Sequence, residues 1–480
     1  MEQFIGVDQG TTATKVSCVY EDGRAQLVYQ KNHRQITPEP GWVEHDGDEI
    51  YNNIAQALDK TGPGSALGID HQGESIVAWD KKSKTCFYNV IVWQDSRTSA
   101  WIENLKKDGL EPVVQEKTGL PLDPYFPASK MRWILDNIPE AKTALKKGRL
   151  CMGTMDSFFI HRLTNVFSTD YNSASRTCLF NVRTLAWDRE LCDIFGVPME
   201  VLPPVVSNLG DFGCFGSTPV TASIIDQFAG IYGHGCRKAG DFKFTFGTGG
   251  FMQALSGESI VEDKKYGLLP CLCWKFGNEA PMFGVDGGIY NAASAINWAR
   301  SLTLFDEYEE LNDFSYPSAI ERNLAFVPAL SGLACPYWDR SAAGLWAGMH
   351  LGTTRKDMMQ AVVEGIALRA ATILNVTDQI VPLKEEMKVD GGITENPYFL
   401  QFLADITRKN VIVPDYGQIS SYGTALLARK GLGKEDSPVN TACSQVTWKD
   451  KTQRDYLKYF EKMVRCSRGT RKIGSSQIRV

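Results

Sequence analysis

The sequence predicts an α/β protein built from two lobes. Segments with the composition of strands alternate along the chain with segments of helical periodicity, which favours an α/β fold over an all-β fold. The chain has 480 residues, a length at which the usual size of domains gives about two to four units. A strand–turn–strand unit near the amino terminus recurs in similar form about half a chain later, which indicates an internal duplication.

The first strand–turn–strand unit begins the chain. Residues 4–8 form a short strand that ends at Asp8, a Gly-Thr-Thr turn with Thr11 and Thr12 follows, and residues 15–20 return as a second strand. The glycine allows close approach of a ligand, exposed N–H groups suit an anion, and the threonine hydroxyls add donors. Asp8 is a hard oxygen ligand suited to Mg²⁺. The unit predicts a phosphate-binding turn, but not of the Walker type, because no Gly-Lys-Ser/Thr follows.

The second unit occupies residues 241–255, where a strand again enters a Gly-Thr-Gly turn that contains Gly247 and Thr248. Two facing turns of this kind would bind a nucleotide in a cleft between the lobes. We place the lobes at residues 1–238 and 239–435. Residues 436–480 form an extension with a basic, non-periodic tail from Arg465, which we expect to be peripheral.

Further elements fit the same class. A helix capped near Asp48 follows the first unit, strands at residues 67–69 and 76–79 come next, and long helices are expected over residues 357–375 and 397–408.

Composition narrows the classes of function. The chain is 43% hydrophobic with a net charge of -5, so we expect no nucleic-acid partner and no membrane surface. The amino terminus lacks the pattern of a signal peptide, and no apolar stretch approaches a membrane span. The 12 cysteines show no metal-ligand spacing and are best explained as reduced thiols. We expect a cytoplasmic protein.

A series of longer motifs follows in a fixed order. They occupy residues 41–46, 92–98, 118–126, 154–160, 169–177, 226–227, 247–249, 328–339 and 389–392. The series resembles the FGGY carbohydrate kinases, and among them the glycerol kinases, over about residues 3–430. The resemblance implies an RNase-H-like core in each lobe, as in actin and hexokinase, with ATP and the acceptor between the lobes.

The resemblance also implies catalytic roles. Asp226 matches the general base that takes the proton of the acceptor hydroxyl as this attacks the γ-phosphoryl group. Asp8 matches the aspartate linked to Mg²⁺. The structural alternative for Asp226 is the cap of a helix that begins at Gln227, and both roles can hold together.

The nucleotide contacts implied by the resemblance lie in both halves of the chain: Thr11, Thr12, Lys15, Gly247, Thr248, Asn297, Gly392 and Asn396. Lys15 stands where the family usually has arginine, so the charge is kept and the bidentate fork is lost. Ordinary turn or helix chemistry is the alternative for Asn297, Gly392 and Asn396.

The acceptor contacts implied by the resemblance are Glu74, Trp93, Tyr125, Asp226, Gln227 and Phe251. Trp93 and Phe251 would be apolar walls, although both residue types are more often simple core residues. The pattern departs at Gly73, where glycerol kinases carry an arginine beside the glutamate. Loss of that arginine removes hydrogen-bond donors, leaves Glu74 without its partner and vacates volume for an extra hydroxymethyl group.

Three meanings of Gly73 stay open: weak phosphorylation of glycerol, a larger polyol or sugar as acceptor, or an impaired protein that only binds. We favour an ATP- and Mg²⁺-dependent kinase for a small polyol or sugar, with a divergent glycerol kinase as the alternative. An actin- or Hsp70-like ATPase has no need for an acceptor pocket, and an inactive regulator has no need for the base. The resemblance further implies a small-molecule substrate and a homo-oligomer, a dimer or tetramer.

Overall fold

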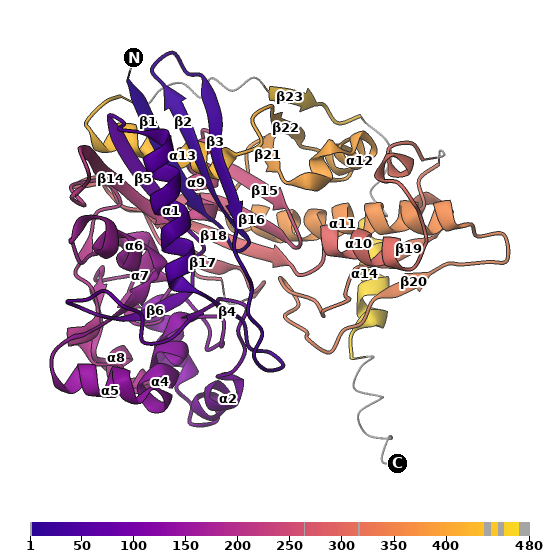
Figure 1. The fold of residues 1–480 in the computed structure, drawn as a ribbon. Helices are drawn as coiled ribbons and strands as arrows, with labels where there is room; N and C mark the ends of the chain where they lie inside the picture. The colour runs from indigo at the N-terminus through magenta and orange to yellow at the C-terminus, as the bar shows by residue number, and fades with distance from the viewer. Residues whose placement is uncertain (1, 264, 315–316, 436–442, 450–455, 470–480) are drawn as a thin grey trace.

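Two β-sheets organise the molecule, one in each half of the chain (Figure 1). The computed structural model describes residues 2–263, 265–314, 317–435, 443–449 and 456–469. The N-terminal sheet has six strands in the order β13-β14-β5-β1-β2-β3. Their bounds are β1 Gln3–Gln9, β2 Ala13–Tyr20, β3 Ala25–Asn32, β5 Ala66–His71, β13 Cys214–Phe215 and β14 Thr218–Ile225.

The C-terminal sheet has seven strands in the order β17-β18-β16-β15-β21-β22-β23. Their bounds are β15 Phe242–Phe246, β16 Gly250–Gly257, β17 Leu269–Trp274, β18 Met282–Ile289, β21 Glu386–Asp390, β22 Asn410–Pro414 and β23 Cys443–Val446.

The two sheets share one pairing scheme. In the first, β1 pairs antiparallel with β2 and parallel with β5, which pairs parallel with β14. In the second, β15 pairs antiparallel with β16 and parallel with β21, which pairs parallel with β22. This correspondence is what the predicted duplication requires, and the predicted α/β class is confirmed.

A helical insertion separates β5 from β14 and lies below the N-terminal sheet in Figure 1. Its strands β7 (Val90–Ile91), β6 (Ile76–Asp80) and β8 (Leu150–Thr154) form a small sheet with β4 (Glu44–His45), which comes before β5 in the chain. Its helices are α2 Ser99–Lys107, α3 Glu111–Thr118, α4 Pro127–Asn137, α5 Pro139–Lys146, α6 Met155–Thr164, α7 Tyr171–Ser175 and α8 Arg189–Phe195. Three candidate acceptor residues lie in loops of this insertion: Glu74, Trp93 and Tyr125.

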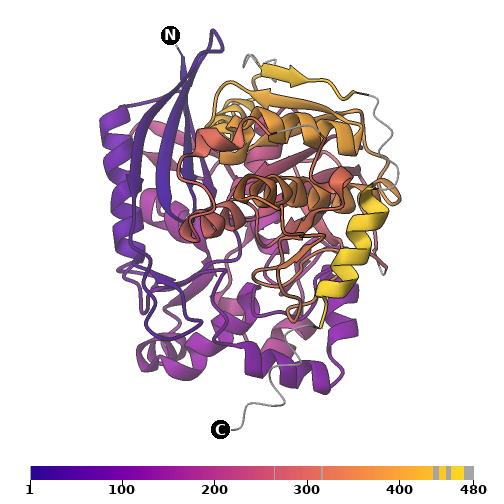
Figure 2. The ribbon, with the colours of Figure 1, turned by 90° about the vertical axis from the view of Figure 1, so that its right-hand side faces the viewer.

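Helix α1 (Gly47–Thr61) covers the outer side of the N-terminal sheet, as Figure 2 shows. Ile50, Ile54 and Leu58 are buried as predicted. The cap is Asp46 instead of Asp48, since the Asp46 side chain accepts from two backbone N–H groups of the first turn.

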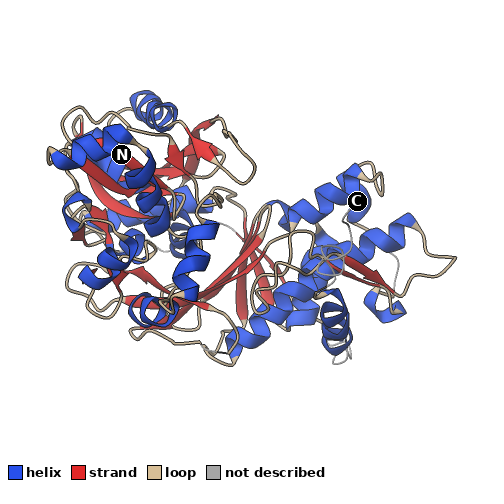
Figure 3. Ribbon diagram, turned by 90° about the horizontal axis from the view of Figure 1, so that it is seen from below, coloured by secondary structure: helices blue, strands red, loops and turns tan. Residues whose placement is uncertain are grey.

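Helices α9 (Asp226–Gly233) and α13 (Ile419–Gly431) pack against each other between the two sheets. α13 also lies directly on β1 and β5. A Cβ at Gly68 of β5 would lie 2.5 Å from the carbonyl oxygen of Thr424, so the packing requires glycine there. Although α13 lies in the predicted C-terminal lobe, its packing joins the two halves. Figure 3 shows helices and strands in both halves of the molecule. The boundary at residues 238 and 239 stays a prediction.

The C-terminal half is completed by α10 (Ala293–Ser301), α11 (Arg355–Asp378), α12 (Pro397–Thr407) and α14 (Tyr456–Ser467). The helices expected over residues 357–375 and 397–408 correspond to α11 and α12. By length and composition α11 is the one helix among the described residues that could span a membrane, but 89% of its apolar window is buried in the C-terminal core. It is therefore explained as a core helix.

The C-terminal extension is more integrated than its sequence indicates. β23 adds to the edge of the C-terminal sheet, and α14 buries Phe460 and Val464 fully in the C-terminal core. Arg465, where the non-periodic tail was predicted to start, lies in the last turn of α14. The rest of that predicted tail, residues 470–480, lies outside the described residues.

Candidate active site

Three aspartates gather where the parallel strands of the N-terminal sheet end. Asp8 near the end of β1 is directly opposite Asp70 of β5, and Asp226 follows the last residue of β14 as the first residue of α9. Burial raises the pKa of all three, to about 8 for Asp226, and the charge of Asp8 adds to the shift of the other two. Like charges held this close favour protonation or a cation.

Asp70 was not singled out from the sequence. Thr424 of α13 donates a hydrogen bond to one of its carboxylate oxygens. The Asp8 and Asp70 carboxyl groups lie within hydrogen-bond distance of each other, and Oδ1 of Asp70 is buried without a donor among the described residues. Carboxylate oxygens are the ligands that Mg²⁺ prefers. The donor set of Asp8 and Asp70 therefore fits a bound magnesium ion.

The predicted capping role of Asp226 is wrong, because Ile225 is the N-cap residue of α9 and no side chain caps this helix. Helix α9 begins at Asp226 itself, after Ile225, and the Asp226 carboxylate accepts from the backbone N–H of Gln227 at 2.7 Å. This bond occupies only Oδ1, and Oδ2 is available as a proton acceptor.

The first predicted phosphate turn joins β1 and β2. The hydroxyl oxygen of Thr11 accepts from Trp93 Nε1 at 3.0 Å, while Thr12 is exposed. Lys15 of β2 pairs with Asp8 across the hairpin, and its charge opposes the rise in the pKa of Asp8 that burial causes.

The second predicted turn joins β15 and β16. The carbonyl oxygen of Thr248 accepts from the backbone N–H groups of Ala292 and Ser294, so the turn is fixed to the start of α10, and Gly247 accepts from Ala293. The side chain of Thr248 is exposed. The turn thus presents a hydroxyl on a rigid support.

Glu74 is the centre of the candidate acceptor site, and the prediction that it lacks a partner is wrong. Arg176, which follows α7, donates from Nε to Glu74 Oε1 at 2.6 Å, and the Tyr125 hydroxyl donates to Oε2 at 3.1 Å. Burial and the charge of Glu74 raise the pKa of Tyr125 well above its ordinary value, which keeps the phenol a donor. Arg176 belongs to a motif recognised in the sequence, but no role was assigned to it.

Ile225 restricts the space directly next to Gly73. A Cβ added at Gly73 would lie 3.0 Å from Cγ2 and 3.2 Å from Cδ1 of Ile225. The absent arginine therefore leaves no open space along this direction, and a larger acceptor has to be argued from other residues.

Lys130, which the sequence did not single out, fixes the backbone of two predicted acceptor residues by hydrogen bonds. Its ammonium group is fully buried and donates to the backbone carbonyl oxygens of Tyr125 at 2.5 Å and Glu74 at 3.3 Å. Burial lowers its pKa to about 7. Trp93 and Tyr125 stand edge to face with ring centroids 5.7 Å apart, so the two predicted acceptor residues lie side by side.

The opposite wall of the site comes from the C-terminal sheet. Gln253 of β16 donates from Nε2 to Gln227 Oε1 at 2.7 Å and to Asp286 Oδ1 at 3.1 Å. Phe251 is two residues before Gln253, and alternation along the strand puts both on the same face. Gln253 and Asp286 were also not found from the sequence, because polar residues on a strand carry no motif of their own.

The remaining nucleotide candidates lie apart along the C-terminal half. Asn297 is exposed on α10 and accepts from the Tyr308 hydroxyl at 2.7 Å. A Cβ at Gly392 would meet no atom within 4 Å. Asn396 caps α12 by accepting from Phe399 N at 2.8 Å and donates to the carbonyl of Leu311. The structure thus shows the helix-capping alternative for Asn396.

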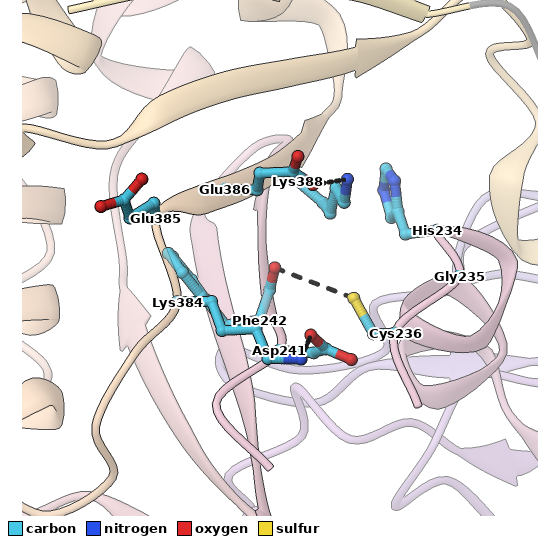
Figure 4. A pocket seen from close by; sticks show the side chains of 9 residues that line it. All are labelled: His234, Gly235, Cys236, Asp241, Phe242, Lys384, Glu385, Glu386 and Lys388. Carbon is cyan, nitrogen blue, oxygen red and sulfur yellow. Dashed lines mark hydrogen bonds and ion pairs between the residues drawn. The ribbon is translucent and has the colours of Figure 1, made fainter. Parts of the chain in front are cut away.

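A pocket of about 390 Å³ lies at the other end of β15 (Figure 4). Phe242 of β15 lines it together with charged residues of β21 and of the segments that precede the two strands, including Asp241, Lys384 and Lys388. It contains no residue predicted to bind ATP or the acceptor.

Comparisons with known proteins show which family this chain belongs to. The model of the N-terminal domain of the FGGY family of carbohydrate kinases matches residues 3–221, and that of the C-terminal domain matches residues 242–431. The glycerol kinase of Halothermothrix orenii is 38% identical over 88% of this chain and 89% of its own length. The glycerol kinase of Bdellovibrio bacteriovorus is 36% identical over 90% of this chain and 91% of its own.

Solved structures are similar over nearly the whole chain. The glycerol kinase of Plasmodium falciparum with ADP has a TM-score of 0.89 at 30% identity, covering 97% of this chain and 98% of that one. The ligand-bound xylulose kinase of Lactobacillus acidophilus has a TM-score of 0.83 at 22% identity with 99% of both chains covered, which shows the fold alone. With both family domains matched in order and these relatives matched almost end to end, the chain belongs to the FGGY family of carbohydrate kinases.

Proposed function

We propose that this kinase transfers the γ-phosphoryl group of Mg²⁺-bound ATP to a hydroxyl of a small neutral polyol or related sugar, and that its preferred acceptor is longer than glycerol. The main observation behind this proposal is that Asp226 lies between the candidate magnesium ligands and the candidate acceptor wall. It lies beside Asp8 and Asp70, and the next residue, Gln227, bonds to the Gln253–Asp286 wall.

The geometry supports a direct transfer. The acceptor hydroxyl gives its proton to the Asp226 carboxylate while its oxygen forms the bond to the γ-phosphorus, and the bond to the bridging oxygen breaks so that ADP leaves. Magnesium held at Asp8 and Asp70 would supply charge neutralisation for the phosphates. Thr11, Thr12, Lys15, Gly247 and Thr248 are proposed to bind and orient them.

The second candidate is a glycerol kinase with a divergent pocket. It is favoured by the glycerol kinase relatives and by the Arg176–Glu74 pair, which supplies an arginine to Glu74 in spite of Gly73. We also propose a cytoplasmic homo-oligomer, a dimer or tetramer, which sedimentation of the purified protein tests.

Transfer from [γ-³²P]ATP in the presence of Mg²⁺, with Asp226→Asn as the variant, tests the proposed function. Loss of the base is expected to lower kcat by roughly 10²–10⁴, while ATP binding, measured by calorimetry, stays within about threefold because the amide keeps the shape of the side chain. Radioactivity must appear in the polyol. ADP release without a labelled acceptor would instead favour an ATPase, and normal turnover by Asp226→Asn would remove Asp226 as the base.

A further inference from the structure

Two buried polar atoms at the acceptor wall have no hydrogen-bond partner among the described residues: Arg176 Nη1 and Gln253 Oε1. Arg176 is 3% exposed and Gln253 is 1% exposed. Buried polar groups of native proteins are nearly always paired, so an orphaned donor and acceptor in one site require an explanation. A ligand that supplies both partners is such an explanation.

The orientation of the Gln253 amide is fixed by its surroundings. Its Nε2 donates to Asp286 Oδ1 at 3.1 Å and to Gln227 Oε1 at 2.7 Å. The Asp286 carboxylate accepts, so the amide nitrogen of Gln253 faces it and the carbonyl oxygen faces away. The orphaned oxygen of Gln253 is therefore a property of the network.

Arg176 and Asp286 approach each other without a direct hydrogen bond. Nη2 of Arg176 lies 3.8 Å from Oδ2 of Asp286. A hydroxyl oxygen about 2.8 Å from each atom fits this gap, because it can accept from the guanidinium and donate to the carboxylate. The pair thus has the spacing for a shared hydroxyl.

Charge decides which ligand class fits. The wall and its neighbours carry the carboxyl groups of Glu74, Asp226 and Asp286, whose charge Arg176, Lys130 and Lys243 offset in part. Burial raises the pKa of Asp286, and the nearby guanidinium opposes this shift. An acidic sugar would add negative charge to this group, so a neutral hydroxylated carbon is the matching ligand.

We propose that Arg176, Gln253 and Asp286 form a subsite that binds a hydroxyl of the acceptor beyond the glycerol-sized part held at Glu74 and Asp226, and that this subsite selects erythritol or a pentitol over glycerol. The inference rests on the proposed function and deepens it. It assigns the selectivity for a longer polyol to these three residues and no longer to Gly73.

Two variants test the subsite without changing the base. Asp286→Asn keeps the size of the side chain and removes the charge that accepts from the ligand, and Gln253→Leu removes the orphaned carbonyl. Asp405→Asn is the matched control, because this aspartate is similarly buried but lies on α12 in the C-terminal core. The measurements are kcat/KM for erythritol, xylitol, ribitol and glycerol, and calorimetric binding of each polyol without ATP.

For each subsite variant we expect the ratio of kcat/KM for the best longer polyol to kcat/KM for glycerol to fall about tenfold or more, since a site built to bind a hydroxyl discriminates strongly. Binding of the longer polyol should weaken in parallel, and Asp405→Asn should leave the ratio unchanged. A wild-type protein that binds glycerol more tightly than every longer polyol, or variants that lower all acceptors equally, would overturn the subsite.

Failure of the proposed function has a different signature. If the wild-type protein binds a longer polyol in an Asp286-dependent way but transfers no phosphate to it, the subsite stands and the kinase activity toward polyols does not. If phosphate is transferred only to glycerol and neither variant changes the relative kcat/KM of the acceptors, the kinase activity is supported and the subsite is ruled out.

Discussion

At the scale of single residues, the positive charge of Lys243 lowers the pKa values of two nearby aspartates, Asp390 and Asp226. It is a nearly fully buried lysine of β15 whose ammonium group donates to the Thr245 hydroxyl at 2.6 Å. Burial raises the pKa of Asp390, but the charge of Lys243 and a hydrogen bond from His234 bring it to about 2. The same positive charge opposes the rise in the pKa of Asp226.

Lys243→Met is expected to move the acid limb of the pH profile of kcat/KM for the acceptor to higher pH. Only the deprotonated carboxylate of Asp226 accepts the proton, and its pKa of about 8 is held down by the lysine. Without the cation, the carboxylate stays protonated to higher pH. Lys243→Arg keeps the charge and should keep the midpoint. A midpoint that is the same in wild type and Lys243→Met would show that Asp226 is not the titrating group or that Lys243 does not act on it.

The sequence identified the motif residues of the candidate site, but not the residues that form hydrogen bonds or ion pairs with them. Asp8, Glu74 and Asp226 belong to motifs and were predicted, and the structure brings them into one site with Tyr125 and Gln227. Arg176 could have been suspected, because a buried arginine in a motif needs a carboxylate partner. Asp286 and Gln253 could not, since their roles arise only when β16 and β18 pair across the site from Arg176.

At the scale of elements, the crossing of α9 and α13 joins the halves of the molecule through glycines. A Cβ at Gly233 of α9 would lie 3.1 Å from the backbone nitrogen of Gly423, and a Cβ at Gly423 would overlap the carbonyl of Ala229. The sequence predicted strands and helices near their observed positions because their periodicity is local. It could not predict this crossing, because close packing of distant helices leaves no periodic signal beyond the glycines themselves.

Gly423→Ala is expected to lower the free energy of unfolding by about 1–3 kcal/mol, because the added methyl group has no space in the helix crossing. Helix propensity alone predicts a gain of about 0.8–1.0 kcal/mol for the same change. Gly417→Ala is the matched control, since a Cβ there meets no atom within 4 Å. Chemical denaturation measures both variants. A Gly423→Ala protein as stable as the wild type would contradict the packing described for α9 and α13.

At the scale of the whole molecule, duplication explains why one site needs both halves. Each sheet contains a strand–turn–strand unit of the same topology, and residues of both sheets contact each other at the candidate acceptor site. Glu74, Arg176 and Asp226 come from the N-terminal half, while Gln253 and Asp286 come from the C-terminal half. The proposed subsite therefore places selectivity for the acceptor where the halves meet.

The most direct test of the account is kcat/KM of the wild-type protein with Mg²⁺ and ATP for glycerol, erythritol, threitol, the pentitols, and common ketopentoses and ketohexoses. We predict that erythritol or a pentitol exceeds glycerol by about tenfold or more, because its additional hydroxyl accepts from Arg176 and donates to Asp286 in the proposed subsite. Efficient phosphorylation of glycerol, with every longer acceptor slower, would contradict the account and identify a glycerol kinase with a divergent pocket.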